Sequence, residues 1–141
     1  MTATRPFLDT NVFLYALDRT DGRKSRVADE LINQTLATES GVISYQVIQE
    51  FIGFALKKFP SAMSTDELER YLTTVFRRFD VGESSLTMFS QSIALQQRYQ
   101  LSWWDSLIVS AAMQAKCDVL YTEDLQHGQR FGDLVVTNPF V

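Results

Sequence analysis

Five acidic side chains occupy positions from which they could act together on one ion. Asp9 directly follows a short apolar run, and Glu123 and Asp124 directly follow another. Glu50 and Asp105 lie in stretches with helical spacing. Clustered carboxylates repel one another unless a cation neutralises them, and such hard oxygen ligands favour Mg²⁺ or Mn²⁺. With one cysteine and one histidine, the sequence offers no zinc site. We therefore predict a carboxylate site for Mg²⁺ or Mn²⁺, which could activate a water molecule beside a phosphate group.

The elements that must position these acids are indicated by the apolar pattern. Short apolar stretches typical of buried strands occupy residues 7–8, 42–43, 79–81, 117–122 and 134–137. Apolar residues at helical spacing occupy residues 12–17, 27–36, 47–55, 68–79, 86–99 and 104–116. Buried strands that alternate with helices predict an α/β fold with a parallel sheet covered on both faces. Because binding and catalytic residues of parallel sheets lie at the carboxyl ends of the strands, all five acids can face one cleft.

Capping residues and apolar spacing give more detailed expectations for two helices. Ser64 and Glu67 form a capping box, and the helix that follows is expected to continue to Phe79. Ser84 or Ser85 is expected to cap the next helix. The apolar residues of that helix that we expect to face the core are Leu86, Phe89, Ile93 and Tyr99.

Length and composition predict a single compact domain spanning residues 1–141. The chain has 141 residues, 45% of them hydrophobic, which is enough to bury a core without disulfides or a structural metal. Its single cysteine, Cys117, excludes a disulfide framework and fits a reducing compartment. No apolar run approaches the roughly 18 residues of a membrane helix, and the first residues lack the apolar core of a signal peptide. We expect a cytoplasmic protein without a membrane partner.

The net charge of −4 argues at first against a polyanionic partner. Setting the five acids aside, however, leaves twelve of the seventeen acidic residues against thirteen basic ones. The basic residues are grouped at 19–26, 57–58 and 77–78. Once a cation neutralises the acids, the rest of the chain is therefore compatible with a nucleic acid.

Four segments resemble the PIN-domain ribonucleases, and more narrowly the VapC-type toxins of bacterial toxin–antitoxin pairs. They are FLDTNVFLYALD at 7–18, SYQVIQEF at 44–51, LSWWDSLIVSAA at 101–112 and LYTEDLQHGQRF at 120–131. The segments follow the family's order and extend through nearly the whole chain. The resemblance implies a three-layer α/β/α fold with a central parallel sheet.

The resemblance also implies an activity and a set of site residues. It implies metal-dependent endonucleolytic cleavage of RNA, in which metal-activated water attacks in line and leaves a 5′-phosphate. The residues implied to hold one or two Mg²⁺ or Mn²⁺ ions are Asp9, Glu50, Asp105 and Asp124. Asn11 and Thr122 match the family's supporting polar positions, whereas Glu123 is either a third supporting residue or a solvated side chain. A cognate antitoxin that covers the site and a homodimer are the implied partners.

Several residues keep more than one interpretation. Trp103 and Trp104 could stack on unpaired bases, although paired aromatics at a helix start more often pack in a core or an interface. The basic residues at 19–26 either contact RNA phosphates or form a solvated loop. His127 is the only histidine, which argues against a metal-free nuclease with paired imidazoles, and we expect it in a loop.

Two other functions compete with the ribonuclease. An aspartyl-phosphate phosphatase also places an Asp after its first strand, but it needs a second acid two residues later, where this chain has Asn11. The six glycines form no phosphate-binding loop. The second alternative is a catalytically silent PIN-like module that binds RNA or protein. Without a metal, such a module would gain nothing from clustered negative charge.

Overall fold

The computed structural model describes residues 4–57 and 63–141. The strands are β1 (Pro6–Leu8), β2 (Val42–Ser44), β3 (Asp80–Gly82), β4 (Val119–Tyr121), β5 (Arg130–Phe131) and β6 (Leu134–Thr137). The helices are α1 (Thr10–Leu17), α2 (Gly22–Thr38), α3 (Tyr45–Lys57), α4 (Thr65–Thr74), the short 3₁₀ helix η1 (Phe76–Arg78), α5 (Leu86–Tyr99) and α6 (Trp103–Gln114). Lys58, one of the grouped basic residues, lies outside the described residues.

The strands form one sheet in the order β3-β2-β1-β4-β6-β5. Neighbouring strands are parallel except β5, which runs antiparallel to β6. This arrangement confirms the predicted α/β fold with a central parallel sheet. The strand β5 was not predicted, because its two residues are too short to show an apolar pattern. It is joined to β6 by a two-residue turn in which Gly132 has a positive φ of 62°.

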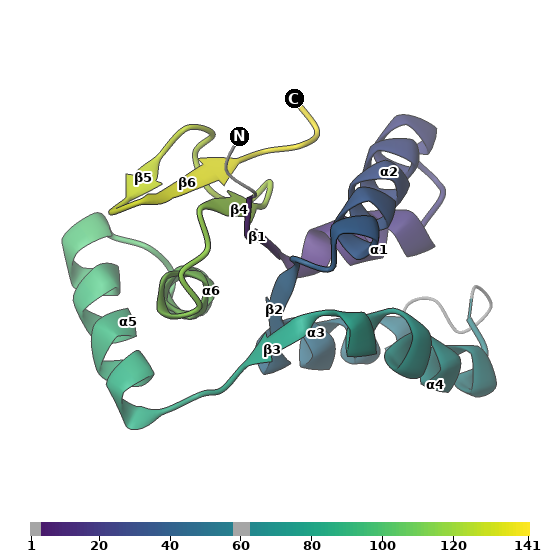
Figure 1. Ribbon diagram of the computed structural model, residues 1–141, viewed down its shortest axis with the longest axis horizontal. Coiled ribbons are helices and arrows are strands. Elements are labelled where there is room, and N and C mark those ends of the chain that lie inside the picture. Colours follow the sequence, from purple (N-terminus) through teal and green to yellow (C-terminus); the bar gives the residue numbers. More distant parts are fainter. Residues whose placement is uncertain (1–3, 58–62) are drawn as a thin grey trace.

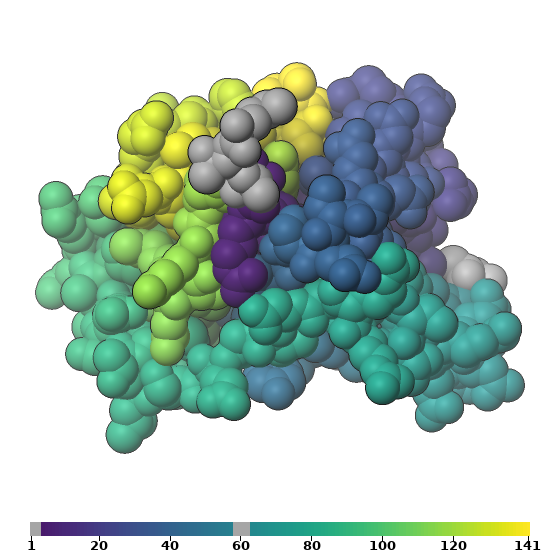
Figure 2. Space-filling model, viewed as in Figure 1, coloured from purple at the N-terminus to yellow at the C-terminus, as the bar shows by residue number. Residues whose placement is uncertain are grey.

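The sheet separates two helical layers, as Figure 1 shows. The connections from β1 to β2 and from β2 to β3 step toward one edge of the sheet, and their helices α1 to α4 cover one face. The connection from β3 to β4 returns across the sheet, so α5 and α6 cover the other face. In the space-filling view, α2 (blue) and α5 (green) consequently form opposite flanks of the molecule (Figure 2).

Aromatic rings form the core between the sheet and the first helical layer. The ring of Phe13 on α1 contacts Phe76 and Phe79 edge-on, with centroid distances of 5.0 and 5.5 Å. Phe76 and Phe79 both lie beyond the end of α4, so the expectation of one helix continuing to Phe79 was wrong. The helix ends after Thr74, whose hydroxyl donates back to the Arg70 carbonyl, and the chain turns through η1 to bring both rings onto Phe13.

Of the four apolar residues of α5 predicted to face the core, only Tyr99 packs against it, beside Phe131. Leu86 and Ile93 are 85% and 58% exposed, and Phe89 is also exposed. The reason is that α6 packs closely against the opposite face of α5, which is built from small or flexible side chains. The Ser110 hydroxyl of α6 donates to the Met88 carbonyl of α5 at 3.2 Å, a contact that a larger residue at 110 would prevent. Apolar spacing gave the period of α5 correctly but identified the wrong face as buried.

Other expectations for the helices are confirmed. The capping box of α4 is present, with Ser64 accepting from the Glu67 amide. Ser85 rather than Ser84 caps α5. Cys117 is a buried free thiol. In the part of the chain that the structure describes, no helix has the length and apolar character needed to cross a membrane.

Candidate functional site

The carboxyl ends of β1 and β4 form the natural binding position of this sheet. The two strands are neighbours in the sheet, but the chain leads from them in opposite directions. It continues from β1 to β2 on one side of the pair, and from β4 through β5 to β6 on the other side. Ligands of open α/β sheets bind beyond the strand ends where connections diverge in this way, and we use the word crevice for this region. Asp9 directly follows β1, and Thr122, Glu123 and Asp124 directly follow β4.

Asp9 is the buried centre of this crevice. Its side chain is 5% exposed and caps the start of α1. One carboxylate oxygen accepts from the Thr10 amide at 2.7 Å, and the other accepts from the Thr122 hydroxyl at 2.8 Å. Burial raises the pKa of Asp9 to about 7, against the lowering effect of these hydrogen bonds and with smaller raising effects from Asp124 and Glu50. The ionised form of Asp9 is therefore costly in the absence of a cation.

Thr122 connects Asp9 to Asp124. The Thr122 side chain is fully buried, and its hydroxyl oxygen also accepts from the Asp124 amide at 3.1 Å. Asn11 donates from Nδ2 to Asp124 Oδ2 at 3.3 Å. Thr122 thus donates to the carboxylate that follows β1, and Asn11 donates to the carboxylate that follows β4.

Glu50 and Asp105 approach the crevice from α3 and α6. Asp105 lies in the first turn of α6, and its amide donates to the Ser102 hydroxyl at 3.1 Å. Glu50 accepts from Gln46 Nε2 at 2.8 Å, and the same nitrogen lies 3.3 Å from the Trp104 carbonyl oxygen. Gln46, which the sequence did not mark as a site residue, therefore ties Glu50 to the start of α6.

The acidic quartet of Asp9, Glu50, Asp105 and Asp124 is electrostatically coupled. Burial raises the pKa of Asp105, and the Glu50 charge raises it further. Burial raises the pKa of Asp124, with further raising effects from Asp105, Glu123 and Glu50 that exceed the lowering effect of Asn11. Within residues 4–57 and 63–141, the ion pairs of lysine and arginine involve other acids and leave the quartet uncompensated.

The donor set of the quartet fits a hard divalent cation. All its donors are oxygens, and the Thr10 hydroxyl and Asn11 Oδ1 beside Asp9 are buried without a hydrogen-bond partner among the described residues. In the same ranges, no three Asp, Glu, His or Cys side chains converge as closely as the ligands of a metal ion. The carboxylates share one crevice, and a cation would have to draw them together against their mutual repulsion.

Glu123 points to different partners. It accepts hydrogen bonds from the Tyr15 hydroxyl and from Lys24 Nζ, the latter at 2.9 Å. Its side chain is only 23% exposed, so it is an ion-paired residue rather than a solvated one. Tyr15 and Lys24 are about a hundred positions away in the chain, and no sequence pattern connects them to Glu123.

The two tryptophans differ in their surroundings. Trp103 packs beside Phe89 with a centroid distance of 6.5 Å, which supports the packing interpretation. Trp104 is 64% exposed and borders a depression of about 370 Å³ between α3, α5 and α6. His127 is exposed in a loop, as predicted, and its Nδ1 accepts from the Asn138 amide.

The basic segment at 19–26 is largely committed to contacts within the chain. Arg19 pairs with Asp29 at 3.2 Å, and Arg23 donates to the Phe140 carbonyl at 2.8 Å. Together with the Lys24 ion pair, these contacts mean that three of its four basic side chains have partners in the protein itself. The expected loop is wrong for residues 22–26, which begin α2. Arg19 and Arg23 are nevertheless exposed, so a contact of this segment with RNA phosphates stays a prediction.

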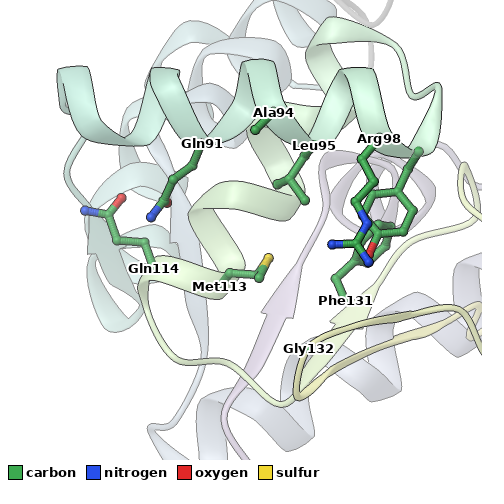
Figure 3. Close-up of a pocket in the computed structure, with 9 residues that line it drawn as sticks. Gln91, Ala94, Leu95, Arg98, Met113, Gln114, Phe131 and Gly132 are labelled. Atoms are coloured by element: carbon green, nitrogen blue, oxygen red, sulfur yellow. The ribbon is translucent and has the colours of Figure 1, made fainter.

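A separate pocket lies away from the acidic quartet. It has a volume of about 550 Å³ and lies between α5, the end of α6 and β5. Figure 3 shows Leu95 from α5 and Met113 from α6 at this pocket, with Arg98 at one end. Asp105 is at the opposite end of α6 from Met113, so this pocket does not belong to the acidic site.

Comparisons with known proteins agree with this architecture. The family model described as PIN domain matches residues 7–130. No curated protein matches the sequence significantly. A toxin–antitoxin complex from Klebsiella pneumoniae is similar in structure, with 20% identity, a TM-score of 0.66 and coverage of 95% of this chain and 97% of that one. FitAcB from Neisseria gonorrhoeae has 21% identity, a TM-score of 0.64 and coverage of 96% and 98%.

A third similar structure is Mycobacterium tuberculosis VapC20, described as a sarcin–ricin loop cleaving toxin. It has 17% identity, a TM-score of 0.61 and coverage of 84% of this chain and 89% of that one. At these identities, the structural likeness demonstrates a shared fold.

Proposed function

The chain belongs to the PIN domain family, and from this premise we propose that it is a metal-dependent endoribonuclease that acts as the toxin of a toxin–antitoxin pair. The observation that carries the proposal is the uncompensated acidic quartet, with Asp9 buried, where the connections of the sheet diverge. Fixing four like charges in one crevice is costly for a fold, and a divalent cation removes that cost. The similarity to toxin structures supports the toxin role.

Each residue of the site has a definite task in this proposal. Asp9, Asp105 and Asp124 are the metal ligands, and Glu50 completes the set and orients the attacking water. Bound Mg²⁺ or Mn²⁺ would supply Lewis acidity, which lowers the pKa of water and stabilises charge on phosphoryl oxygens. Thr122 and the Thr10 amide fix the Asp9 carboxylate through its two oxygens.

Two amide side chains orient the remaining acids. Asn11 holds one oxygen of Asp124, and Gln46 holds one oxygen of Glu50. In both cases, the second carboxylate oxygen is left to face the cation or the water. Positioning of this kind around ligands commonly changes metal affinity by about 10- to 100-fold when it is removed.

Cleavage of RNA is the direct test. Purified protein free of antitoxin is incubated with transfer RNA, ribosomal RNA fragments and messenger RNA in Mg²⁺, in Mn²⁺ and in EDTA. Asp105→Asn removes one quartet charge at a half-buried position. Asp66→Asn removes an exposed acid from the first turn of α4 and is the matched control.

The proposal expects metal-dependent cuts with 5′-phosphate ends that Asp105→Asn abolishes and Asp66→Asn retains. Cuts that survive Asp105→Asn would refute the assigned site. If the protein is folded and binds the metal but cleaves no RNA in the panel, the alternative of a catalytically silent PIN-like module is favoured.

The partners belong to the same proposal. The likeness to a toxin–antitoxin complex supports an antitoxin partner. We propose that the antitoxin covers the acidic quartet and that RNA is the substrate. We also propose a homodimer, which is tested by the molar mass of the free protein in solution. A monomer at micromolar concentration would exclude it.

A further inference from the structure

Glu123 is held by two residues from the first helical layer. Lys24 Nζ on α2 lies 2.9 Å from Glu123 Oε2, and the Tyr15 hydroxyl on α1 donates to Glu123 Oε1. Lys24 Nζ also lies 3.2 Å from the Tyr15 oxygen, which closes the triangle. We call these three residues the Glu123 clamp. It joins α1, α2 and the turn that follows β4.

The clamp is partly buried rather than fully exposed to solvent. The side chains of Lys24 and Glu123 are 25% and 23% exposed. Lys24 Nζ lies 4.7 Å from the Tyr15 ring centroid and 5.7 Å from that of Phe140, distances at which an ammonium is attracted to an aromatic ring. Phe140 is buried, and Arg23 donates to its carbonyl. An ion pair in such a setting has a better defined geometry than a pair on the open surface.

The position of the clamp matters because Glu123 is flanked on both sides by site residues. Thr122 binds the Asp9 carboxylate, and the Asp124 amide binds the Thr122 hydroxyl. A fixed Glu123 side chain therefore fixes the turn from which Asp124 projects. Without these two partners, the Glu123 side chain would be mobile and would add a fifth carboxylate beside the quartet.

We propose that Lys24 and Tyr15 are positioning residues of the acidic site, which hold Glu123 so that Asp124 faces the crevice and Glu123 stays out of the ligand set. The consequence for metal binding rests on the proposed function, whereas the ordering of the turn does not. Neither residue would touch the metal or the RNA.

The direction in which one substitution changes the Mn²⁺ affinity distinguishes a positioning role from a purely electrostatic one. Lys24→Met removes a positive charge that pairs with Glu123, the residue before Asp124 of the quartet. If Lys24 acted only through its charge, its loss would strengthen the binding of Mn²⁺. If it acts by positioning, the loss weakens Mn²⁺ binding, by about tenfold or more on the scale of other supporting residues of metal sites.

Mn²⁺ affinity is measured by titration calorimetry without RNA, with thermal melts to verify folding. The proposal expects weaker binding in Lys24→Met, near wild-type binding in Lys24→Arg, and weaker binding in Tyr15→Phe, which removes only the hydroxyl. Arg19→Met is the matched control, because it breaks the ion pair between Arg19, which lies just before α2, and Asp29 on that helix, without contact to Glu123. Unchanged or tighter binding in Lys24→Met overturns the proposal, and if that variant does not fold, unchanged binding in Tyr15→Phe does so.

A metal-free measurement keeps this result separate from the proposed function. Hydrogen exchange of the Asp124 amide is followed by NMR in EDTA, where faster exchange is expected in Lys24→Met and in Tyr15→Phe than in Arg19→Met. If wild-type protein does not bind Mn²⁺, the proposed metal site fails, while the amide exchange still decides the clamp. Equal exchange rates in all three variants would refute the clamp even in a protein that binds Mn²⁺ well.

Discussion

Replacing Asp9 with Asn should stabilise the metal-free protein at high pH. Burial raises the pKa of Asp9 from 3.8 to about 7, and one pKa unit corresponds to about 1.4 kcal/mol. Keeping Asp9 ionised in the folded state therefore costs about 4 kcal/mol at pH 8. Asn can still accept from the Thr10 amide, but its own amide would face the Thr122 hydroxyl, at a cost of about 1 kcal/mol for the rearranged hydrogen bond. The expected net gain is about 3 kcal/mol at pH 8.

The pH dependence follows from the direction of the shift. Because the folded-state pKa of Asp9 lies above its ordinary value, the stability of the wild type is highest below pH 4 with respect to this group and falls as the pH rises through 7. At pH 5 the cost of ionisation is below about 2 kcal/mol, so Asp9→Asn should then gain less than about 1 kcal/mol. In the presence of Mg²⁺, the wild type should instead be more stable than Asp9→Asn, because the ion binds the wild type more tightly.

Urea unfolding in EDTA at pH 5 and pH 8 measures this difference. Asp21→Asn is the matched control, because Asp21 also caps a helix and accepts from a main-chain amide, but is exposed. Its stability should change by less than about 0.5 kcal/mol at both pH values. An Asp9→Asn variant that is less stable than the wild type at pH 8, or whose difference from it is the same at both pH values, would refute the reasoning.

Three further substitutions test the packing and the site. Gly41→Ala should destabilise the fold by about 2 kcal/mol or more in urea unfolding, because a Cβ would lie 2.6 Å from the Phe79 ring; an unchanged midpoint would contradict this packing. Thr122→Val should cost about 1 to 3 kcal/mol because it leaves the Asp124 amide and Asp9 without the hydroxyl, and a stability equal to the wild type would show that this hydrogen bond is dispensable. Trp104→Ala should change stability by less than about 0.5 kcal/mol, since the side chain is 64% exposed, and a loss above 1 kcal/mol would place it in a packed contact.

Patterns of neighbouring residues in the sequence were enough to predict the parallel strands and the acids that follow them. Asp9 and Asp124 follow buried strands directly, so the rule for parallel sheets was enough to bring them to one edge. The clamp could not be predicted in this way, because Lys24 and Glu123 meet only when α2 packs beside the turn after β4.

The error in α5 has a different cause. The spacing of Leu86 and Ile93 is that of a buried helical face, yet the face that packs carries Met88 and Ser92. Periodicity identifies the period of a helix but does not decide between two faces when the partner helix offers small residues. Here the serines of α6 allow a close approach that apolar bulk alone would not predict.

The two edges of the sheet limit how this protein can associate with others. One edge is the three-residue strand β3, where Arg5 and Asp80 form an ion pair, and the other is the two-residue strand β5, which begins with Arg130. Short edge strands with charged side chains offer little main chain for an added strand, which protects a sheet against edge-to-edge aggregation. A peptide segment should therefore bind this protein through its helical surfaces and its crevice rather than by extending the sheet.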